Sequence, residues 1–305
     1  MSVLSSMEVA PTPPRPADTA PFPAAAPALA VRSFGLTDRG KLRPTNQDQF
    51  LVARLIKALA VQGTSLAQPK VQQSSDQSHL FVVADGMGGG RGGEEASALA
   101  IGSVESFVVE TFKWFGEGRG RDQEGLLATF QSALAHANDR VLAEADRRPE
   151  LHDMGTTLTL AYSLNRALFV AHVGDSRCYL FRAGALHRVT SDHTLAEELV
   201  RRGHMRPEEA AHHQWRHVIT NAIGGGSPDV RVEVHQLYLE ADDAVLLCSD
   251  GLTGMVPEPE IAAVLGAEPD PERACRHLVA RANEAGGRDN ITVVVARYEA
   301  APSAA

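Results

Sequence analysis

Short apolar runs alternate with helical patterns along this chain and predict a mixture of strands and helices. Residues 48–52 and 80–84 form runs typical of strands, and a glycine-dense turn follows the second run. Three further runs, at 156–163, 167–173 and 177–182, are separated by short turns. We expect these three strands to pair as antiparallel neighbours.

Two long amphipathic helices are predicted between these groups of strands. Apolar residues spaced by three and four positions define one face of each helix. They are Ile101, Val104, Val108, Phe112 and Phe115 in the first helix, and Leu127, Phe130, Leu134, Ala137 and Val141 in the second. Two consecutive helices between antiparallel strands argue against a doubly wound parallel sheet. They suit an α+β fold in which sheets pack face to face with helices outside.

The rest of the chain predicts shorter elements and disordered ends. Helices are expected at 195–202, 207–212, 259–265 and 271–283, strands at 231–239, 244–248 and 291–297, and loops at 55–78 and 116–125. Residues 1–30 are rich in proline and alanine, and repeated proline prevents helix propagation. We expect a disordered tail over 1–30, one folded domain over 31–299 and a disordered end over 300–305.

Composition narrows the class of protein. The 305 residues include 29 basic and 38 acidic side chains, and this net charge of −9 does not favour nucleic-acid binding. No apolar run approaches the roughly 18 residues that span a bilayer, and no secretion signal is recognisable. Three cysteines without a CxxC pair favour buried thiols in a reducing cytoplasm over a disulfide framework.

One pattern recurs along the chain, in which an apolar strand meets an aspartate beside a glycine. Asp85, Asp175 and Asp250 each follow such a strand, Asp289 precedes one, and Asp48 opens another. A single Asp-Gly pair also suits a type I′ hairpin turn. However, Asp85 is followed by more glycines and a helical pattern, and the residues after Asp250 do not alternate as a returning strand does.

The alternative interpretation is that these strand ends converge in space. Carboxylates gathered in this way repel one another and raise their own pKa values, and a divalent cation removes that penalty. Oxygen ligands without thiolates select magnesium or manganese rather than zinc. The sequence therefore predicts a magnesium or manganese centre built from distant parts of the chain.

Six short motifs carry a resemblance to a known family. In chain order they are Arg43-Pro44-Thr45-Asn46-Gln47-Asp48, Asp85-Gly86-Met87-Gly88-Gly89, Gly155-Thr156-Thr157, Gly174-Asp175-Ser176-Arg177, Ser249-Asp250-Gly251 and Gly287-Arg288-Asp289-Asn290. Together they resemble the ordered motifs of PPM-type (type 2C-like) protein phosphatases in their bacterial form, over about residues 32–298. The resemblance implies a four-layer α-β-β-α sandwich of two antiparallel sheets, with a dinuclear metal centre at one end.

The resemblance also implies a role for each motif residue. Asp85 would bridge two metals, and the carbonyl oxygen of Gly86 would be a further ligand. Asp250 and Asp289 would hold one of these metals, and Asp48 would lie beside the other, partly through water. The implied ions are Mn²⁺ or Mg²⁺, two in number, with a third bound more weakly.

The remaining implied roles concern the third ion and the substrate. Asp175 would help to hold the third, weaker metal, and Arg43 would grip the substrate phosphate with its planar fork. Two cations roughly 3.5–4 Å apart would lower the pKa of a shared water, and the hydroxide would attack phosphorus in line. The implied reaction is hydrolysis of phosphoserine and phosphothreonine in proteins, with Arg43, Asp48 and Asp85 as the catalytic residues.

The chain departs from the family pattern at two positions. Gln47 stands where many members have glutamate, and a neutral amide is a poorer metal ligand. Met87 stands where eukaryotic members commonly carry a histidine proposed as general acid, so the proton donor is not identified. An alternative function is a catalytically weak, phosphatase-like signalling or binding module, for which Gln47 is the only support.

A nucleotide-binding alternative rests on glycine spacing alone. Gly88, Gly90 and Gly93 match a GxGxxG pattern between a predicted strand and a helix. A second helix follows the first where a dinucleotide-binding βαβ unit requires a parallel strand. We therefore assign these glycines to a turn near the metal centre.

A histidine-bearing segment has no assigned chemistry. His204, His212, His213 and His217 lie within it, and His213 and His217 have helical i, i+4 spacing. We interpret it as a solvated, mobile stretch, which in the resembling family is a flap at about residues 192–221. Arg177, close to Asp175, is interpreted as an exposed strand residue outside the site.

The flap position leads to a first prediction. Replacement of residues 195–217 is expected to change phosphopeptide preference more than hydrolysis of a small aryl phosphate, because only the peptide would reach the flap. Kinetics on both substrates would check this, and equal effects would contradict it. From the resemblance we further expect a cytoplasmic monomer that acts on phosphorylated proteins, including a serine/threonine protein kinase.

Overall fold

The computed structural model describes residues 29–56, 58–60, 71–73, 78–89, 91–111, 123–210 and 213–300. Several expectations therefore lie outside the described residues. They concern the tail up to residue 28, the end after residue 300, most of the loop expected at 116–125, and the residues Gly90, Phe112, Phe115 and His212.

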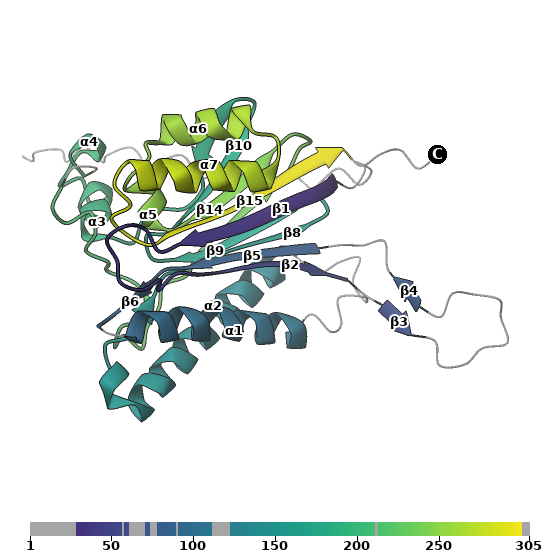
Figure 1. Cartoon of the computed structure of the whole chain (residues 1–305). Helices are drawn as coiled ribbons and strands as arrows, with labels where there is room; N and C mark the ends of the chain where they lie inside the picture. Colours follow the sequence, from purple (N-terminus) through teal and green to yellow (C-terminus); the bar gives the residue numbers. More distant parts are fainter. Residues whose placement is uncertain are drawn as a thin grey trace, which may run out of the picture.

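Two five-stranded antiparallel sheets stack face to face between layers of helices (Figure 1). Sheet A has the order β1 (Leu29–Asp38), β15 (Ile291–Ala300), β14 (Ala244–Cys248), β10 (Arg177–Arg182) and β11 (Ala185–Arg188). Sheet B has the order β13 (Glu233–Tyr238), β9 (Ala167–Val173), β8 (Leu158–Leu164), β5 (Ser78–Ala84) and β2 (Gln49–Leu55). Smaller sheets join β12 (Ile223–Gly224), β7 (Gly155–Thr156) and β6 (Gly86–Met87), and join β3 (Ala58–Ala60) to β4 (Val71–Gln73).

The helices lie on the outer faces of this sandwich (Figure 1). Sheet B is covered by α1 (Gly92–Thr111) and α2 (Gln123–Arg147), and the short 3₁₀ helix η2 (Pro149–Leu151) follows α2. Sheet A is covered by α5 (Asp250–Thr253), α6 (Glu258–Ala267) and α7 (Pro271–Glu284). The flap helices α3 (Leu195–Arg201) and α4 (Pro207–Ala210) lie at one end. None of the described helices has the length and apolarity needed to cross a bilayer.

Side-chain alternation explains why the sandwich has three separate apolar cores. On β5, Leu80 and Val82 face α1 and α2, whereas Phe81 and Val83 face the opposite sheet. Successive strand residues point to opposite faces, so a strand covered on both sides is apolar at every position. The predicted α+β class and four-layer sandwich are therefore confirmed.

The predicted hairpin between 167–173 and 177–182 is wrong. β9 belongs to sheet B, whereas β10 pairs with β14 and β11 in sheet A. The turn through Gly174 and Asp175 therefore carries the chain from one sheet to the other. Apart from His172 in β9 and the terminal Arg177 and Arg182 of β10, both strands are apolar on both faces, and this pattern does not reveal which sheet a strand joins.

The structure adds elements that the pattern did not reveal. β1 begins at Leu29, within the predicted tail, and pairs along its whole length with β15. β11 was not predicted, and β3 and β4 form a short ladder inside the expected loop at 55–78. β1 lacks strict alternation because its residues are only partly buried at the edge of sheet A.

Candidate active site

Five aspartates from separate elements meet at one end of the sandwich. Asp48 precedes β2, Asp85 ends β5, Asp175 follows β9, Asp250 opens α5 and Asp289 precedes β15. Burial, followed by the negative charges of the other four, raises the pKa of Asp85 well above its ordinary value. The convergence predicted from the sequence is therefore present in the fold.

The backbone of Asp85 is fixed by the Gly155-Thr156-Thr157 motif. The N–H of Asp85 donates to Thr157 Oγ1 at 2.9 Å, and the carbonyl oxygen of Asp85 accepts from the N–H of Thr157 at 2.9 Å. Thr156 Oγ1 donates to the same carbonyl oxygen at 2.8 Å. These three bonds leave the Asp85 carboxylate free to face the site.

Gly86 is required by the close approach of two backbone segments. A Cβ atom here would overlap the carbonyl oxygen of Gly93 and would lie 2.6 Å from that of Gln47. Gly93, in the first turn of α1, packs in the same way against the Gln47 side chain. Gly86 and Gly93 therefore let the chain turn tightly beside Asp85.

Asp48 is the most enclosed member of the cluster, with 1% of its surface exposed. Ser249 Oγ donates to Asp48 Oδ2 at 2.7 Å, and the N–H of Thr292 donates to Ser249 Oγ at 3.0 Å. The other oxygen, Oδ1, is buried without a hydrogen-bond partner. Burial raises the pKa of Asp48, and the charges of Asp250 and Asp289 raise it further.

Asn290 holds the loop that carries the first motif. Its Oδ1 accepts from the N–H of Gln47 at 2.8 Å, and its Nδ2 donates to the carbonyl oxygens of Arg39 and Thr45, both at 2.9 Å. One side chain thus fixes three points of residues 39–47. Asn290 and Ser249 belong to the sequence motifs, but the motifs alone predicted no role for either residue.

Arg43 lies at the exposed side of the cluster. Its Nη2 donates to Asp289 Oδ2 at 2.6 Å, and 54% of its side chain is exposed. A half-exposed guanidinium beside the carboxylates can reach an anion that arrives from solvent. The role of Arg43 in phosphate binding stays a prediction.

Arg177 is not an exposed strand residue, and our interpretation of it was wrong. Its side chain is 22% exposed and binds Asp192 through Nε at 2.9 Å and Nη2 at 2.7 Å. Asp175 lies two residues earlier and is 6% exposed. Burial and the charges of Asp250 and Asp192 raise the pKa of Asp175, and Arg177 partly offsets them.

His217 is closer to the site than the sequence indicated. Its Nδ1 lies 3.5 Å from Asp250 Oδ2, although half of the side chain is exposed. His213 instead packs edge-on against Trp215, with ring centroids 4.8 Å apart. The i, i+4 pair therefore does not act as one metal site, and only His217 reaches the cluster.

The cluster fits hard divalent cations. It offers carboxylate and carbonyl oxygens and no thiolate, because Cys178, Cys248 and Cys275 are all buried as free thiols elsewhere. The orphaned oxygen of Asp48 and the uncompensated charge around Asp85 are both costs that a cation would relieve.

A second group of ligand atoms lies outside the aspartate cluster. Among the described residues, His172, His193 and Glu233 bring three ligand atoms within 4.8 Å of one another.

Comparison with known proteins identifies the family. The family model described as protein phosphatase 2C matches residues 65–286. The chain belongs to the protein phosphatase 2C family. The serine/threonine phosphatase stp of Listeria innocua is 31% identical over 259 residues, which cover 85% of this chain and 92% of that protein.

Solved phosphatase structures share the fold. The serine/threonine phosphatase PstP/Ppp of Mycobacterium tuberculosis is 33% identical with a TM-score of 0.71, covering 88% of this chain and 99% of that one. The catalytic domain of PstP in complex with two manganese ions is 32% identical with a TM-score of 0.69, covering 89% and 99%. This protein phosphatase 2C member is a protein serine/threonine phosphatase, as its motifs predicted, and its substrates are phosphorylated proteins.

Proposed function

We propose that the five aspartates hold Mn²⁺ or Mg²⁺ ions for the hydrolysis of phosphoserine and phosphothreonine. Asp85 would bridge two ions, with the Gly86 carbonyl oxygen as a further ligand. Asp250 and Asp289 would hold one of these ions, and Asp48 would lie beside the other. Asp175 would serve a third, weaker ion. The observation that carries the proposal is the convergence of these carboxylates around Asp85 and the raised pKa that results.

Bound divalent cations supply Lewis acidity, which lowers the pKa of water and neutralises charge on phosphate oxygens. The protein's own contribution is positional. Thr156 and Thr157 fix the backbone of Asp85, and Ser249 fixes one oxygen of Asp48. Since hydrogen bonds within the protein already hold both groups, little reorganisation is needed when substrate arrives.

We assign phosphate binding to Arg43. In the described structure its guanidinium is bound to Asp289 through Nη2. Asp289 would hold a cation, and the fork of the guanidinium would then be available for two phosphate oxygens, a geometry that lysine cannot offer. Asn290 supports this role because it anchors the Arg43 loop on both sides of the arginine.

The proposed metal requirement is tested by assaying a phosphothreonine peptide with Mn²⁺, with a chelator, and with the Asp250→Asn variant. We expect activity with Mn²⁺ only, and a loss of about 10²-fold or more in the variant, as for removal of a group that stabilises transition-state charge. Exposed Asp146→Asn on α2 is the matched control and should behave as the wild type. Activity that ignores the chelator would contradict the proposal.

The alternative of a weak binding module rests on Gln47. Its backbone and side chain pack against Gly86 and Gly93, so the residue has a structural place in the turn. Inactivity of the folded wild type with both Mn²⁺ and Mg²⁺ would favour the binding module.

We further propose a cytoplasmic signalling enzyme that acts as a monomer and includes a serine/threonine kinase among its substrates. Three buried free thiols suit a reducing compartment. A kinase is a reasonable substrate because a serine/threonine phosphatase reverses what such kinases add. A solution mass near 32.6 kDa, the mass of one chain, would support the monomer, and twice that mass would contradict it.

A further inference from the structure

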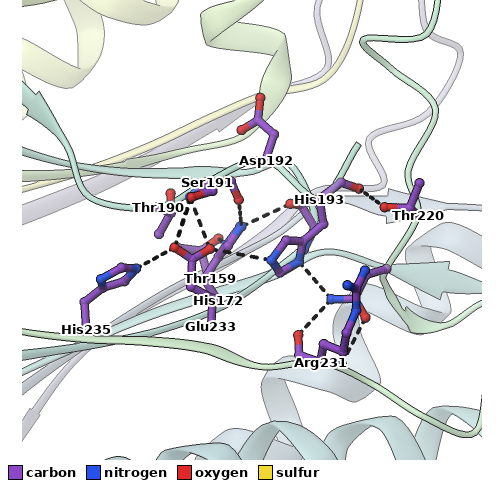
Figure 2. A network of polar contacts seen from close by, with 12 residues as sticks. Thr159, His172, Thr190, Ser191, Asp192, His193, Thr220, Arg231, Glu233 and His235 are labelled. Carbon is purple, nitrogen blue, oxygen red and sulfur yellow. Dashed lines mark hydrogen bonds and ion pairs between the residues drawn. The ribbon is translucent and has the colours of Figure 1, made fainter. Parts of the chain in front are cut away.

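A buried polar cluster lies beside the turn that carries Asp175. His172 is fully buried, and the side chains of His193 and Glu233 are 12% and 20% exposed. His172 belongs to β9 and Glu233 to β13, whereas His193 begins the flap segment. Figure 2 shows His193 and His235 on opposite sides of the Glu233 carboxylate.

His193 binds both ends of one residue, Gly174. The N–H of His193 donates to the Gly174 carbonyl oxygen at 2.7 Å, and the N–H of Gly174 donates to His193 Nδ1 at 3.1 Å. Gly174 has a φ of +112°, and a Cβ atom there would lie 2.5 Å from the Thr157 side chain. The next residue is Asp175, so His193 fixes the glycine turn that presents this carboxylate.

The hydrogen bonds define the tautomer of His193. A backbone N–H can only donate, so Nδ1 must offer its lone pair to Gly174, and Asn221 Nδ2 lies 2.8 Å from the same nitrogen. The proton of the neutral ring is therefore on Nε2, which lies 3.5 Å from Glu233 Oε2. Ser191 and His235 also contact Glu233, at 3.2 and 2.6 Å, and hold its carboxylate in place.

The hydrogen bonds of the two histidines also argue against a metal ion in this cluster. Nε2 of His172 faces the carbonyl oxygens of Gly174 and Ser191, both at 3.0 Å, and therefore carries a proton. Its Nδ1 pairs with Thr159 Oγ1 at 2.9 Å. All four ring nitrogens of the two histidines are thus occupied, and an ion would have to displace several of these bonds. The cluster is a hydrogen-bonded brace.

The brace also connects the Asp175 turn to the base of the flap. The N–H of Thr220 donates to the His193 carbonyl oxygen at 2.8 Å, and Thr220 Oγ1 donates to the same oxygen at 3.2 Å (Figure 2), which closes the segment that begins at His193. On the other side of Asp175, Arg177 binds Asp192. Gly174, directly before Asp175, and Arg177, two residues after it, are therefore bound to the consecutive residues His193 and Asp192.

We propose that His193, oriented by Glu233, is a positioning residue that sets the Gly174 turn and thereby aims Asp175 at the third cation. This inference rests on the proposed role of Asp175. It predicts that the acceptor at the Nδ1 position matters, rather than the imidazole ring as such.

Two substitutions separate the nitrogen atoms of His193. In His193→Asn the side-chain oxygen can occupy the Nδ1 position, whereas in His193→Gln the amide reaches only the Nε2 position. Calorimetric titration of the full chain with Mn²⁺ should show the weakest binding step weakened about tenfold or more in His193→Gln, as for other residues that orient metal ligands. His193→Asn should bind close to the wild type.

Two control variants show whether a change in the weak binding step is specific to His193. Asp175→Asn should remove the same weak step, and His79→Gln, which changes a partly buried histidine at the start of β5, the end of the strand away from Asp85, should leave it unchanged. The tight steps should persist in all four variants. Equal binding by the Asn and Gln variants of His193, or a loss in both, would overturn the role of Nδ1.

Two further measurements test the proposal without relying on the His193→Gln titration. If His193→Gln does not melt cooperatively, Glu233→Ala should weaken the same step and Glu233→Gln, which keeps an acceptor, should preserve it. Nitrogen-15 NMR of the histidines in magnesium buffer should show His193 with its proton on Nε2, and a proton on Nδ1 would overturn the proposal. If the wild type has no weak step, the role of Asp175 fails, and the NMR result alone decides whether His193 braces Gly174.

Discussion

Asp85→Asn is expected to abolish phosphatase activity, by about 10³-fold or more, while it stabilises the metal-free protein. Activity is lost because Asp85 is the carboxylate that the other four surround. Stability rises because the folded chain without metal holds this negative charge among like charges, and an amide of the same shape removes the repulsion.

The sign of the stability change follows from proton linkage. Burial and neighbouring charges raise the pKa of Asp85 in the folded chain above its unfolded value. The folded state therefore binds more protons than the unfolded state, and stability falls as pH rises from about 4 through the folded pKa. In a chelator at pH 8 the variant should melt a few degrees higher, since 1 kcal/mol corresponds to about 2–4 °C in a domain of this size.

Calorimetric melting in a chelator, together with peptide hydrolysis in Mn²⁺, checks both halves of this prediction. Asp146→Asn removes an exposed carboxylate of α2 and should change neither quantity. A metal-free Asp85→Asn protein that melts below the wild type would show that the carboxylates are not in electrostatic conflict. Retained activity would show that the Asp85 carboxylate is not required for catalysis.

Gly251→Ala is expected to lower both stability and metal-dependent activity. A Cβ atom at this position would overlap the carbonyl oxygen of Asn290 and would contact Ile291 Cα at 3.4 Å. Ile291 opens β15, which is paired on both sides, so this backbone cannot move without breaking sheet A. Overpacking of this kind costs about 1–3 kcal/mol, and the displaced Asn290 would also release the Arg43 loop.

A second glycine provides the matched control. Gly102 lies inside α1 and has nothing within 4 Å of the position of an added Cβ. Gly102→Ala should raise stability by up to about 1 kcal/mol, because alanine favours the helix, and should leave activity unchanged. Thermal melts and Mn²⁺ titrations of both variants give the comparison. A Gly251→Ala protein as stable as the Gly102→Ala protein would contradict the predicted overlap.

Much of the fold could be predicted from the sequence because the patterns of helices and strands depend on residues close together in the chain. The helix faces of α1 and α2 follow from apolar spacing, and residues such as Phe130 and Leu134 are buried where that spacing placed them. β14 coincides with the expected strand at 244–248, and α7 lies within one residue of its expected end. Periodicity reports which side of an element meets a core, and it does so before any long-range contact is known.

The sequence predicted which aspartates form the candidate site. It did not predict the residues that hold them in place. Each aspartate stands next to a glycine or at a strand end, which the sequence shows directly. The roles of Asn290, Ser249 and Arg177 depend on contacts across 243, 201 and 15 positions of sequence. Arg177 was misjudged for this reason, since its partner Asp192 lies outside the strand in which Arg177 sits.

The sequence by itself determined the fold class, the family and the acidic residues, because these depend on local spacing and on short motifs in a fixed order. Only the tertiary structure decided that β9 and β10 lie in different sheets, that His217 lies against Asp250, and that His193 binds Gly174. The physical reason is that strand partners and hydrogen-bond partners are chosen by packing between distant segments. A strand that is apolar on both faces fits either sheet equally well until the rest of the chain is in place.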